Sequence, residues 1–317
     1  MTYLSPIPAE LAQVEYVKIY FHLQARDRFD LPQQAWLQLR RELLKTVKTL
    51  EQWGENNDSM ELKNLFHPRV SSDPQVRKLA QKPAPAFVLQ PDLQTYGLIE
   101  AQQRLVLPVL FVGQGTQKVN LFVDLLAMLG QQGLYQGVGQ FMLEAVEAED
   151  ASGVRAMLWS EGQREPVSPP VNDLNWLLER EGQDVERVTL EICSPLRLLR
   201  KKKPLFKAGF SDLFPFVMRR TSSMLASHAC VEVINNPQRY QLLASQLVVE
   251  ENTLRWQDWR SLDGAEQSQD IGGLLGNLTL AGAGLGELFW LLKLGSLLNV
   301  GKGAAYGAGQ YRLRTSC

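Results

Sequence analysis

The C-terminal segment constrains the fold most, because it places a glycine-rich loop between a helical pattern and a strand pattern. Apolar residues at helical spacing occupy residues 285–298 before the loop, and residues 310–313 alternate as in a strand after it. Rossmann and P-loop nucleotide sites run in the opposite order, from strand to helix, so the segment is neither of them. Glycines let backbone N–H groups approach an anion closely, and a tight structural turn is the alternative interpretation. Four glycines and one lysine share nine residues of the loop: Gly301, Lys302, Gly303, Gly307 and Gly309.

A weaker copy of this pattern lies near the middle of the chain. A helical run over residues 121–129 precedes a glycine loop over residues 133–139, and strand-like residues 140–146 follow. Both copies contain glycine, any residue, glycine, glutamine and an aromatic residue in succession, at Gly137–Phe141 and at Gly307–Tyr311. This self-similarity predicts two domains of one architecture, each ending in a glycine-rich loop and a last strand.

The length of the chain also favours two domains, because 317 residues exceed the roughly 250–300 residues that one core usually supports. Three prolines between residues 166 and 170 mark the expected boundary, which divides the chain into residues 1–170 and 171–317. The first part opens with an alternating strand over residues 14–24 and a helix over residues 32–50, for which Asp30 is the expected N-cap. The mixture of strands and helices in both parts predicts an α+β fold of two tandem ferredoxin-like domains.

The composition is that of a soluble globular protein, with 45% hydrophobic and 21% charged residues. The three cysteines share no metal-like spacing, and the N-terminus lacks the pattern of a signal peptide. Glu287 and Lys293 interrupt the most apolar region, so it is a poor membrane span. We therefore expect a cytoplasmic protein with reduced thiols, no membrane association and no metal or other cofactor.

Positive charge is concentrated in one segment, although the net charge of the chain is only -1. Between Ser194 and Arg220 there are eight basic residues and one acidic residue, Asp212. Such segregation produces a local positive potential, which favours a polyanion site over a solvated loop. The candidate residues of this segment are Arg197, Arg200, Lys201, Lys202, Lys203, Arg219 and Arg220.

Four segments of the C-terminal half together resemble the CRISPR-associated Cas6 family of RAMP proteins, which are endoribonucleases that process precursor crRNA. Residues 189–198 resemble the family's strand with its Ser-Pro-Leu-Arg turn, and residues 210–225 resemble the helix that follows. Residues 255–259 with 272–276 are similar to the central strands, and residues 294–313 to the terminal glycine loop.

The resemblance implies two ferredoxin-like domains side by side, with a basic cleft that holds CRISPR repeat RNA. It also implies metal-independent cleavage by the neighbouring 2′-hydroxyl, giving a 5′-hydroxyl and a 2′,3′-cyclic phosphate. The expected RNA-binding residues are the seven cations above and the loop residues Gly301, Lys302, Gly303, Gly307 and Gly309. The alternative is a catalytically inactive RAMP subunit that binds crRNA, with other CRISPR effector subunits as further partners.

Catalysis of this kind needs a proton acceptor and a proton donor, and histidine is the natural residue near neutral pH. Many members of the family carry this histidine on or before the first helix, but residues 32–50 contain none. His22 is the first candidate, because strand alternation places it on one face with Tyr20 and Lys18, and Tyr20 is the candidate partner in the acid–base roles. His67 is the second candidate, and His228 continues the packed face of the helix over residues 210–227.

Overall fold

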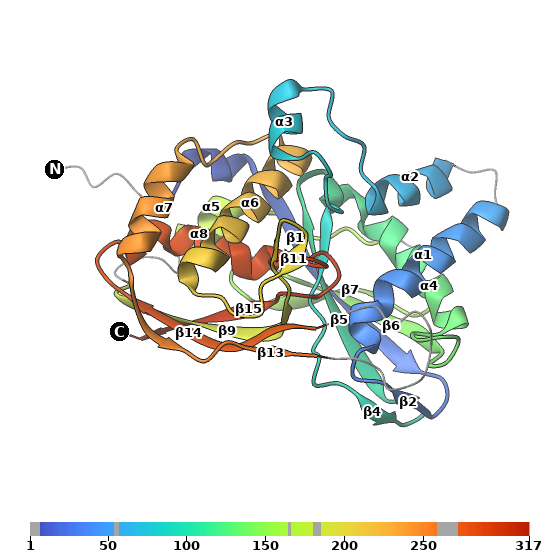
Figure 1. Cartoon of the computed structure of the whole chain (residues 1–317). Helices are drawn as coiled ribbons and strands as arrows, with labels where there is room; N and C mark the ends of the chain where they lie inside the picture. The colour runs from blue at the N-terminus through green and yellow to red at the C-terminus, as the bar shows by residue number, and fades with distance from the viewer. Residues whose placement is uncertain (1–6, 54–56, 164–165, 180–184, 259–271, 317) are drawn as a thin grey trace.

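The computed structural model describes residues 7–53, 57–163, 166–179, 185–258 and 272–316 (Figure 1). It is an α+β protein built on two antiparallel sheets, one from each half of the chain. Within the described ranges no helix is both long enough and apolar enough to cross a membrane.

The first sheet has the strand order β3-β5-β1-β6-β7. Helix α1 (Ala35–Trp53) follows β1, and helix α4 (Val119–Gln132) connects β5 to β6. The main elements therefore run β-α-β-β-α-β, with the first strand between the third and the fourth, as in ferredoxin-like units. The strands are β1 (Glu15–Ala25), β3 (Phe87–Leu89), β5 (Arg104–Val112), β6 (Phe141–Glu149) and β7 (Arg155–Ser160).

The second sheet repeats this arrangement, with the order β12-β14-β9-β15. Helix α6 (Phe210–Ala229) follows β9, and helix α8 (Leu285–Leu298) connects β14 to β15. Figure 1 shows α6, α7 and α8 on one side of this sheet. The strands are β9 (Arg187–Leu196), β12 (Val248–Asn252), β14 (Gly273–Ala281) and β15 (Tyr311–Ser316), with β13 (Arg255–Gln257) also paired to β14.

Shorter elements decorate these two units. Helices α2 (Asn57–Phe66) and α3 (Pro74–Leu79) lie between α1 and β3, and α7 (Pro237–Gln246) lies between α6 and β12. The remaining elements are the 3-10 helices Ala9–Gln13 and Gly113–Lys118, α5 (Leu174–Glu179), β8 (Asn172–Asp173), the pair β2 (Phe29–Leu31) and β4 (Gly97–Ile99), and the hairpin of β10 (Leu199–Arg200) and β11 (Lys203–Pro204).

Two local expectations for the first half were wrong. Asp30 does not cap a helix, because it lies in β2 and pairs with Leu98, and α1 begins only at Ala35. The first half also does not end at the strand after its glycine loop, because β7 pairs with that strand and β8 returns to the start of β1. At Asp30, strand pairing with a distant segment outweighs the local signal.

The two halves share their hydrophobic cores. One face of β1, with Val17, Ile19 and Phe21, packs in the first core, where the Phe21 and Phe122 rings lie 5.6 Å apart. The opposite face of that sheet contributes Leu110 and other residues to the second core, beneath α6 and α8. In return, the C-terminal glycine loop contributes Ala305 and Tyr306 to the first core. This exchange holds the glycine loop against both halves.

Candidate nucleic-acid interface

A surface hollow of about 530 Å³ lies where the two halves meet. Its lining comes from three regions of the chain: residues 78–84 at the end of α3 and just after it, residues 197–223 around α6, and the start of the C-terminal glycine loop. None of the described residues that line it is acidic, so no carboxylate offsets its positive charge. Six of its fourteen lining residues are cations: Lys78, Lys82, Arg197, Arg219, Arg220 and Lys302.

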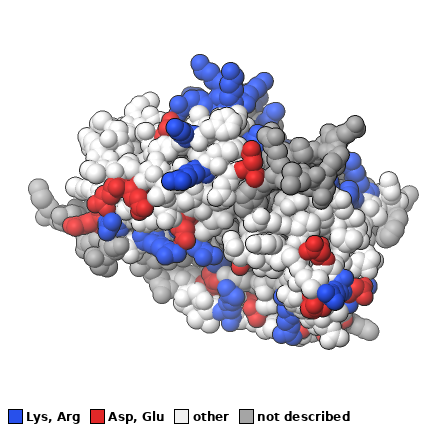
Figure 2. Space-filling model, turned by 60° about the horizontal axis from the view of Figure 1, so that its bottom comes forward, with Lys and Arg blue, Asp and Glu red and all other residues white. Residues whose placement is uncertain are grey.

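Helix capping, helix packing and an aromatic contact position several of these cations. Asp73 caps α3 by accepting a hydrogen bond from the N–H of Gln75, which sets the course of the helix that carries Lys78. Helix α3 packs against α6, so the lysines of the first half meet the arginines of the second. Arg219 also lies over the ring of Phe216, at 4.7 Å from the ring centroid. Figure 2 shows Lys and Arg side chains gathered in patches on one face of the molecule.

Arg220 is the most buried cation of the hollow. Its Nε donates to the carbonyl oxygen of Leu298 at 3.1 Å, next to the glycine loop. Its Nη2 is buried and has no hydrogen-bond partner among the described residues. Burial lowers the pKa of Arg220 to about 10, so the side chain still carries its charge near neutral pH. A buried charge with an unused donor is costly unless an anion completes its environment.

The lysine run forms a two-residue turn between β10 and β11. Lys201 and Lys202 both have a left-handed backbone, with φ of 50° and 64°. Such turns usually use Asn or Gly, because these residues tolerate positive φ. Lys201, Lys202 and Lys203 are exposed at the tip and do not line the hollow, and Arg200 is paired with Asp212 at 2.7 Å.

The glycine loop is tightly built into the molecule. Gly301 has φ of 93°, and a Cβ on it would lie 2.6 Å from the carbonyl oxygen of Arg197. Gly307 has φ of 92°, and a Cβ there would lie 2.9 Å from Pro91 in the first half. The N–H groups of Lys302 and Gly309 donate to carbonyls of residues 197 and 195. Gly301 and Lys302 line the hollow, whereas Gly303, Gly307 and Gly309 do not. Much of the loop therefore has a structural role.

The loop is also tied to β3 of the first half. The N–H of Leu89 donates to the carbonyl of Ala305 at 2.9 Å. The buried Asn299 side chain bridges the carbonyls of Leu89 and Ala304, each at 3.1 Å. These bonds fix the position of the loop relative to the first sheet.

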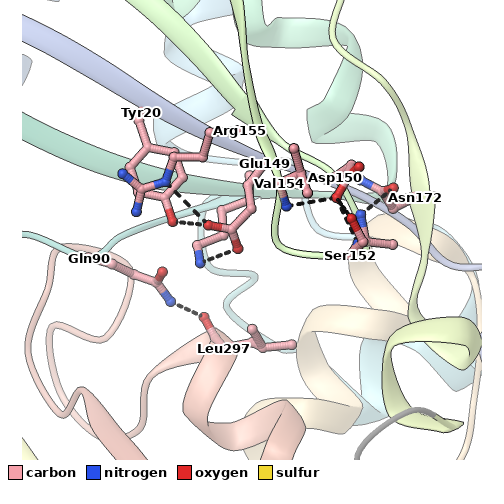
Figure 3. Close-up of polar contacts among 11 residues, drawn as sticks. Tyr20, Gln90, Glu149, Asp150, Ser152, Val154, Arg155, Asn172 and Leu297 are labelled. Atoms are coloured by element: carbon pink, nitrogen blue, oxygen red, sulfur yellow. Dashed lines mark hydrogen bonds and ion pairs between the residues drawn. The ribbon is translucent and has the colours of Figure 1, made fainter.

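Tyr20 and Lys18 lie together, as their shared strand face predicts, but both are bound to one carboxylate (Figure 3). The Tyr20 hydroxyl donates to Glu149, and Lys18 Nζ lies 2.7 Å from the same carboxylate. Arg155 covers the Tyr20 ring at 3.6 Å from its centroid. Burial and the hydrogen bond to Glu149 raise the pKa of the Tyr20 hydroxyl. The hydroxyl is therefore a poor proton donor as long as this cluster stays closed.

The three histidines occupy different environments, and none of them lines the basic hollow. His22 Nε2 on β1 lies 3.0 Å from the carboxylate of Glu147 on the neighbouring strand β6. His67 is exposed after α2. His228 is 4% exposed, as expected for a packing residue, and its Nε2 lies 2.8 Å from the Ala84 carbonyl.

Sequence reasoning missed Lys78 and Lys82, the contribution of the first half to the hollow. Lys78 lies in α3 and Lys82 just after it, and their spacing carries no motif. The nearest signal was the charge of residues 77–82, which contain three cations and no acid.

Two family models match the chain, one for each half. Residues 14–171 match the AF_1859_N model, described as an N-terminal domain. Residues 190–311 match the model of the CRISPR-associated endoribonuclease Cas6. No curated protein matches the chain.

Solved structures share the fold over nearly the whole chain. Cas6 of Thermus thermophilus matches with a TM-score of 0.54 and 15% identity, covering 95% of this chain and 99% of that one. A Cas6 product complex matches with a TM-score of 0.51 and 13% identity, covering 96% and 100%. A partial Cas6-RT-Cas1–Cas2 complex matches with a TM-score of 0.59 and 14% identity over 96% of this chain. The chain spans only 46% of that protein's length.

With its two antiparallel units, the chain has the α+β fold of these Cas6 structures. Residues 190–311, the larger part of the C-terminal half, are similar to the CRISPR-associated endoribonuclease Cas6 family.

Proposed function

We propose that this chain binds CRISPR repeat RNA in the basic hollow and cleaves precursor crRNA within the repeats. The observation that carries the proposal is the hollow itself, where six cations from both halves converge and none of the described lining residues is acidic. Arg220 adds a buried donor that has no acceptor in the described part of the chain. Phosphate oxygens would satisfy both features, because a sugar–phosphate backbone offers repeated negative charge to Lys and Arg.

The proposed reaction is attack of a ribose 2′-oxygen on the adjacent phosphorus. A base removes the 2′-proton, the new O–P bond forms, and the bond to the 5′-oxygen breaks as that oxygen receives a proton. The products are a 2′,3′-cyclic phosphate and a 5′-hydroxyl. Cations of the hollow stabilise the charge that develops on the phosphate. The step needs no metal ion, oxidant or reductant.

His22 remains the first candidate for the proton transfer. Glu147 lies against its imidazole, and a carboxylate partner can orient a histidine for acid–base work. His67 is the second candidate, because it is open to solvent and follows α2 in the first half. Tyr20 is the third, and its hydroxyl has to leave Glu149 before it can act.

The domain organisation belongs to the same proposal. We assign residues 1–170 and 171–317 to two ferredoxin-like RAMP domains, which is supported by the two β-α-β-β-α-β units and by family matches that fall on either side of residue 171. The expected partners are crRNA and other CRISPR proteins.

The test is incubation of the full chain with repeat RNA in EDTA, followed by analysis of the ends. We expect one defined cut with a 5′-hydroxyl and a cyclic phosphate. Cutting that requires added divalent metal, or products with a 5′-phosphate, would contradict the mechanism.

One observation favours a second candidate function, a crRNA-binding subunit without cleavage. None of the described residues lining the hollow is a histidine, although the hollow is well suited to phosphates. Tight binding of repeat RNA that is never cut would establish this alternative.

A further inference from the structure

Two aromatic rings lie beside the basic hollow. Phe206 follows the β10–β11 hairpin and is 59% exposed, and Trp256 lies on β13. Their ring centroids are 4.6 Å apart, with an interplanar angle of 61°. Arg197 connects this pair to the hollow, because it lines the hollow and its guanidinium lies 5.9 Å from the centroid of the Trp256 ring.

The Trp256 ring is held in place by its surroundings. Its indole N–H donates to Asp258 Oδ1 at 2.9 Å. A Cβ on Gly272 would lie 3.0 Å from Trp256 Cζ2, so the backbone closely approaches one side of the indole. Phe206 rests against this fixed ring and presents much of its own surface to solvent. A single exposed apolar residue is common on protein surfaces, but here the exposed ring is supported by a second ring, beside which Arg197 lies.

We propose that Phe206 and Trp256 form a stacking platform for an unpaired base of the RNA whose phosphates occupy the hollow. The inference rests on the proposed function and names a second contact in the same interface. Proteins that hold single-stranded RNA commonly combine a basic groove with aromatic rings on which bases stack. The groove and the platform meet at Arg197, so neighbouring parts of one nucleotide chain can contact both. Stacking needs only the face of a base, so the platform accepts different bases.

The test separates base stacking from charge attraction by using two probes. One is a 12-nucleotide oligo(A) RNA, and the other is an abasic ribose–phosphate strand of the same length. Affinity for the full chain is measured for wild type, Phe206→Ala, Phe206→Tyr and the control Trp176→Ala. Trp176 is an exposed ring on α5 that does not line the hollow.

We expect Phe206→Ala to weaken oligo(A) binding by at least about fivefold, the low end of the range for loss of a stacked base. Binding of the abasic strand should stay unchanged, because its phosphates contact the same cations. Phe206→Tyr should keep most of the affinity for oligo(A), and Trp176→Ala should behave as wild type.

The proposed stacking platform is contradicted if Phe206→Ala leaves the oligo(A) affinity unchanged, or if it weakens binding of both probes equally. Equal weakening would assign Phe206 a structural or protein-contact role. A wild-type chain that binds neither these probes nor repeat RNA overturns the proposed function as well, so the two failures are distinguishable.

Discussion

At the scale of single residues, Arg220 carries the most specific part of the proposed phosphate contact. Its side chain is attached to the Leu298 carbonyl through Nε, while its buried Nη2 has no acceptor among the described residues. Replacing a buried, incompletely satisfied charge by an apolar side chain is often neutral or stabilising. We therefore predict that Arg220→Met keeps or raises the melting temperature and weakens RNA binding about tenfold or more, the loss expected for a charged hydrogen bond. Thermal melting and RNA titration of the same preparation check this. A variant with a lower melting temperature and unchanged RNA affinity would make Arg220 a structural residue.

His228 gives a pH dependence whose sign follows from its burial. Burial lowers its pKa to about 4, the hydrogen bond to the Ala84 carbonyl acts in the opposite sense, and Arg220 lowers the pKa further. The unfolded chain takes up this proton near pH 6.5, whereas the folded chain resists it until about pH 4. The free energy of unfolding should therefore fall as the pH drops from 6.5 to 4, by roughly 3 kcal/mol from this residue.

The check is chemical denaturation across this pH range for wild type and His228→Gln. Glutamine keeps a donor for the Ala84 carbonyl but does not titrate, so its profile should be flatter. His67→Gln is the matched control, because His67 is exposed. If wild type and His228→Gln lose stability in parallel, His228 is not the group responsible.

The candidate proton-transfer residues predict a third outcome. A general acid or base contributes about 10²–10⁴-fold to the rate, so His22→Ala should slow cleavage by that order while RNA affinity stays close to wild type. Single-turnover cleavage with His67→Ala run in parallel tests the two candidates against each other. If the wild type cuts and neither substitution slows it tenfold, histidine catalysis at these positions is wrong.

At the scale of elements, the lysine hairpin combines an unfavourable backbone with a concentration of charge. Two successive lysines adopt positive φ at the tip, where Asn and Gly would be less strained. We predict that changing Lys201, Lys202 and Lys203 together to Ala weakens binding of cognate and unrelated RNA alike, because lysine runs contact phosphates without reading bases. Parallel titrations with repeat RNA and an unrelated RNA of equal length check this. Selective loss of repeat RNA binding would instead mean that the hairpin reads sequence.

Elements with a strong local pattern could be predicted from the sequence. The alternating strand at residues 14–24 is β1, and the apolar periodicity of residues 285–298 coincides with α8. The glycines of both loops do adopt positive φ, as their spacing indicates. By contrast, Asp30 two residues before Pro32 predicts a helix cap. It lies in a strand because that segment pairs with the distant strand β4.

Only part of the candidate site could be predicted from the sequence, because the rest depends on contacts between distant segments. Arg197, Arg219, Arg220 and Lys302 belong to a local excess of charge or to the glycine loop, and the structure brings them together. Lys78 and Lys82 join them because α3 packs on α6, a contact between residues far apart in the sequence. The closed cluster of Tyr20 with Glu149 likewise depends on the pairing of β1 with β6.

At the scale of the whole molecule, the central claim is that RNA phosphates bind where the two halves meet. The cations on the two sides are separated by more than a hundred residues, so neither half carries the complete hollow. Loss of a cation on either side should therefore weaken the same complex. The shared cores and the bonds from the glycine loop to β3 keep both sides in one arrangement.

The most direct test is the salt dependence of repeat RNA binding by wild type and by Lys82→Ala with Lys302→Ala, one cation from each half. For single strands, the slope of log affinity against log salt changes by about 0.7 for each phosphate contact. We predict that the double variant has a slope shallower than wild type by about 1.4. Lys45→Ala, a lysine of α1 that does not line the hollow, should leave the slope unchanged. A double variant with the wild-type slope and affinity would contradict the claim that this hollow holds the RNA backbone.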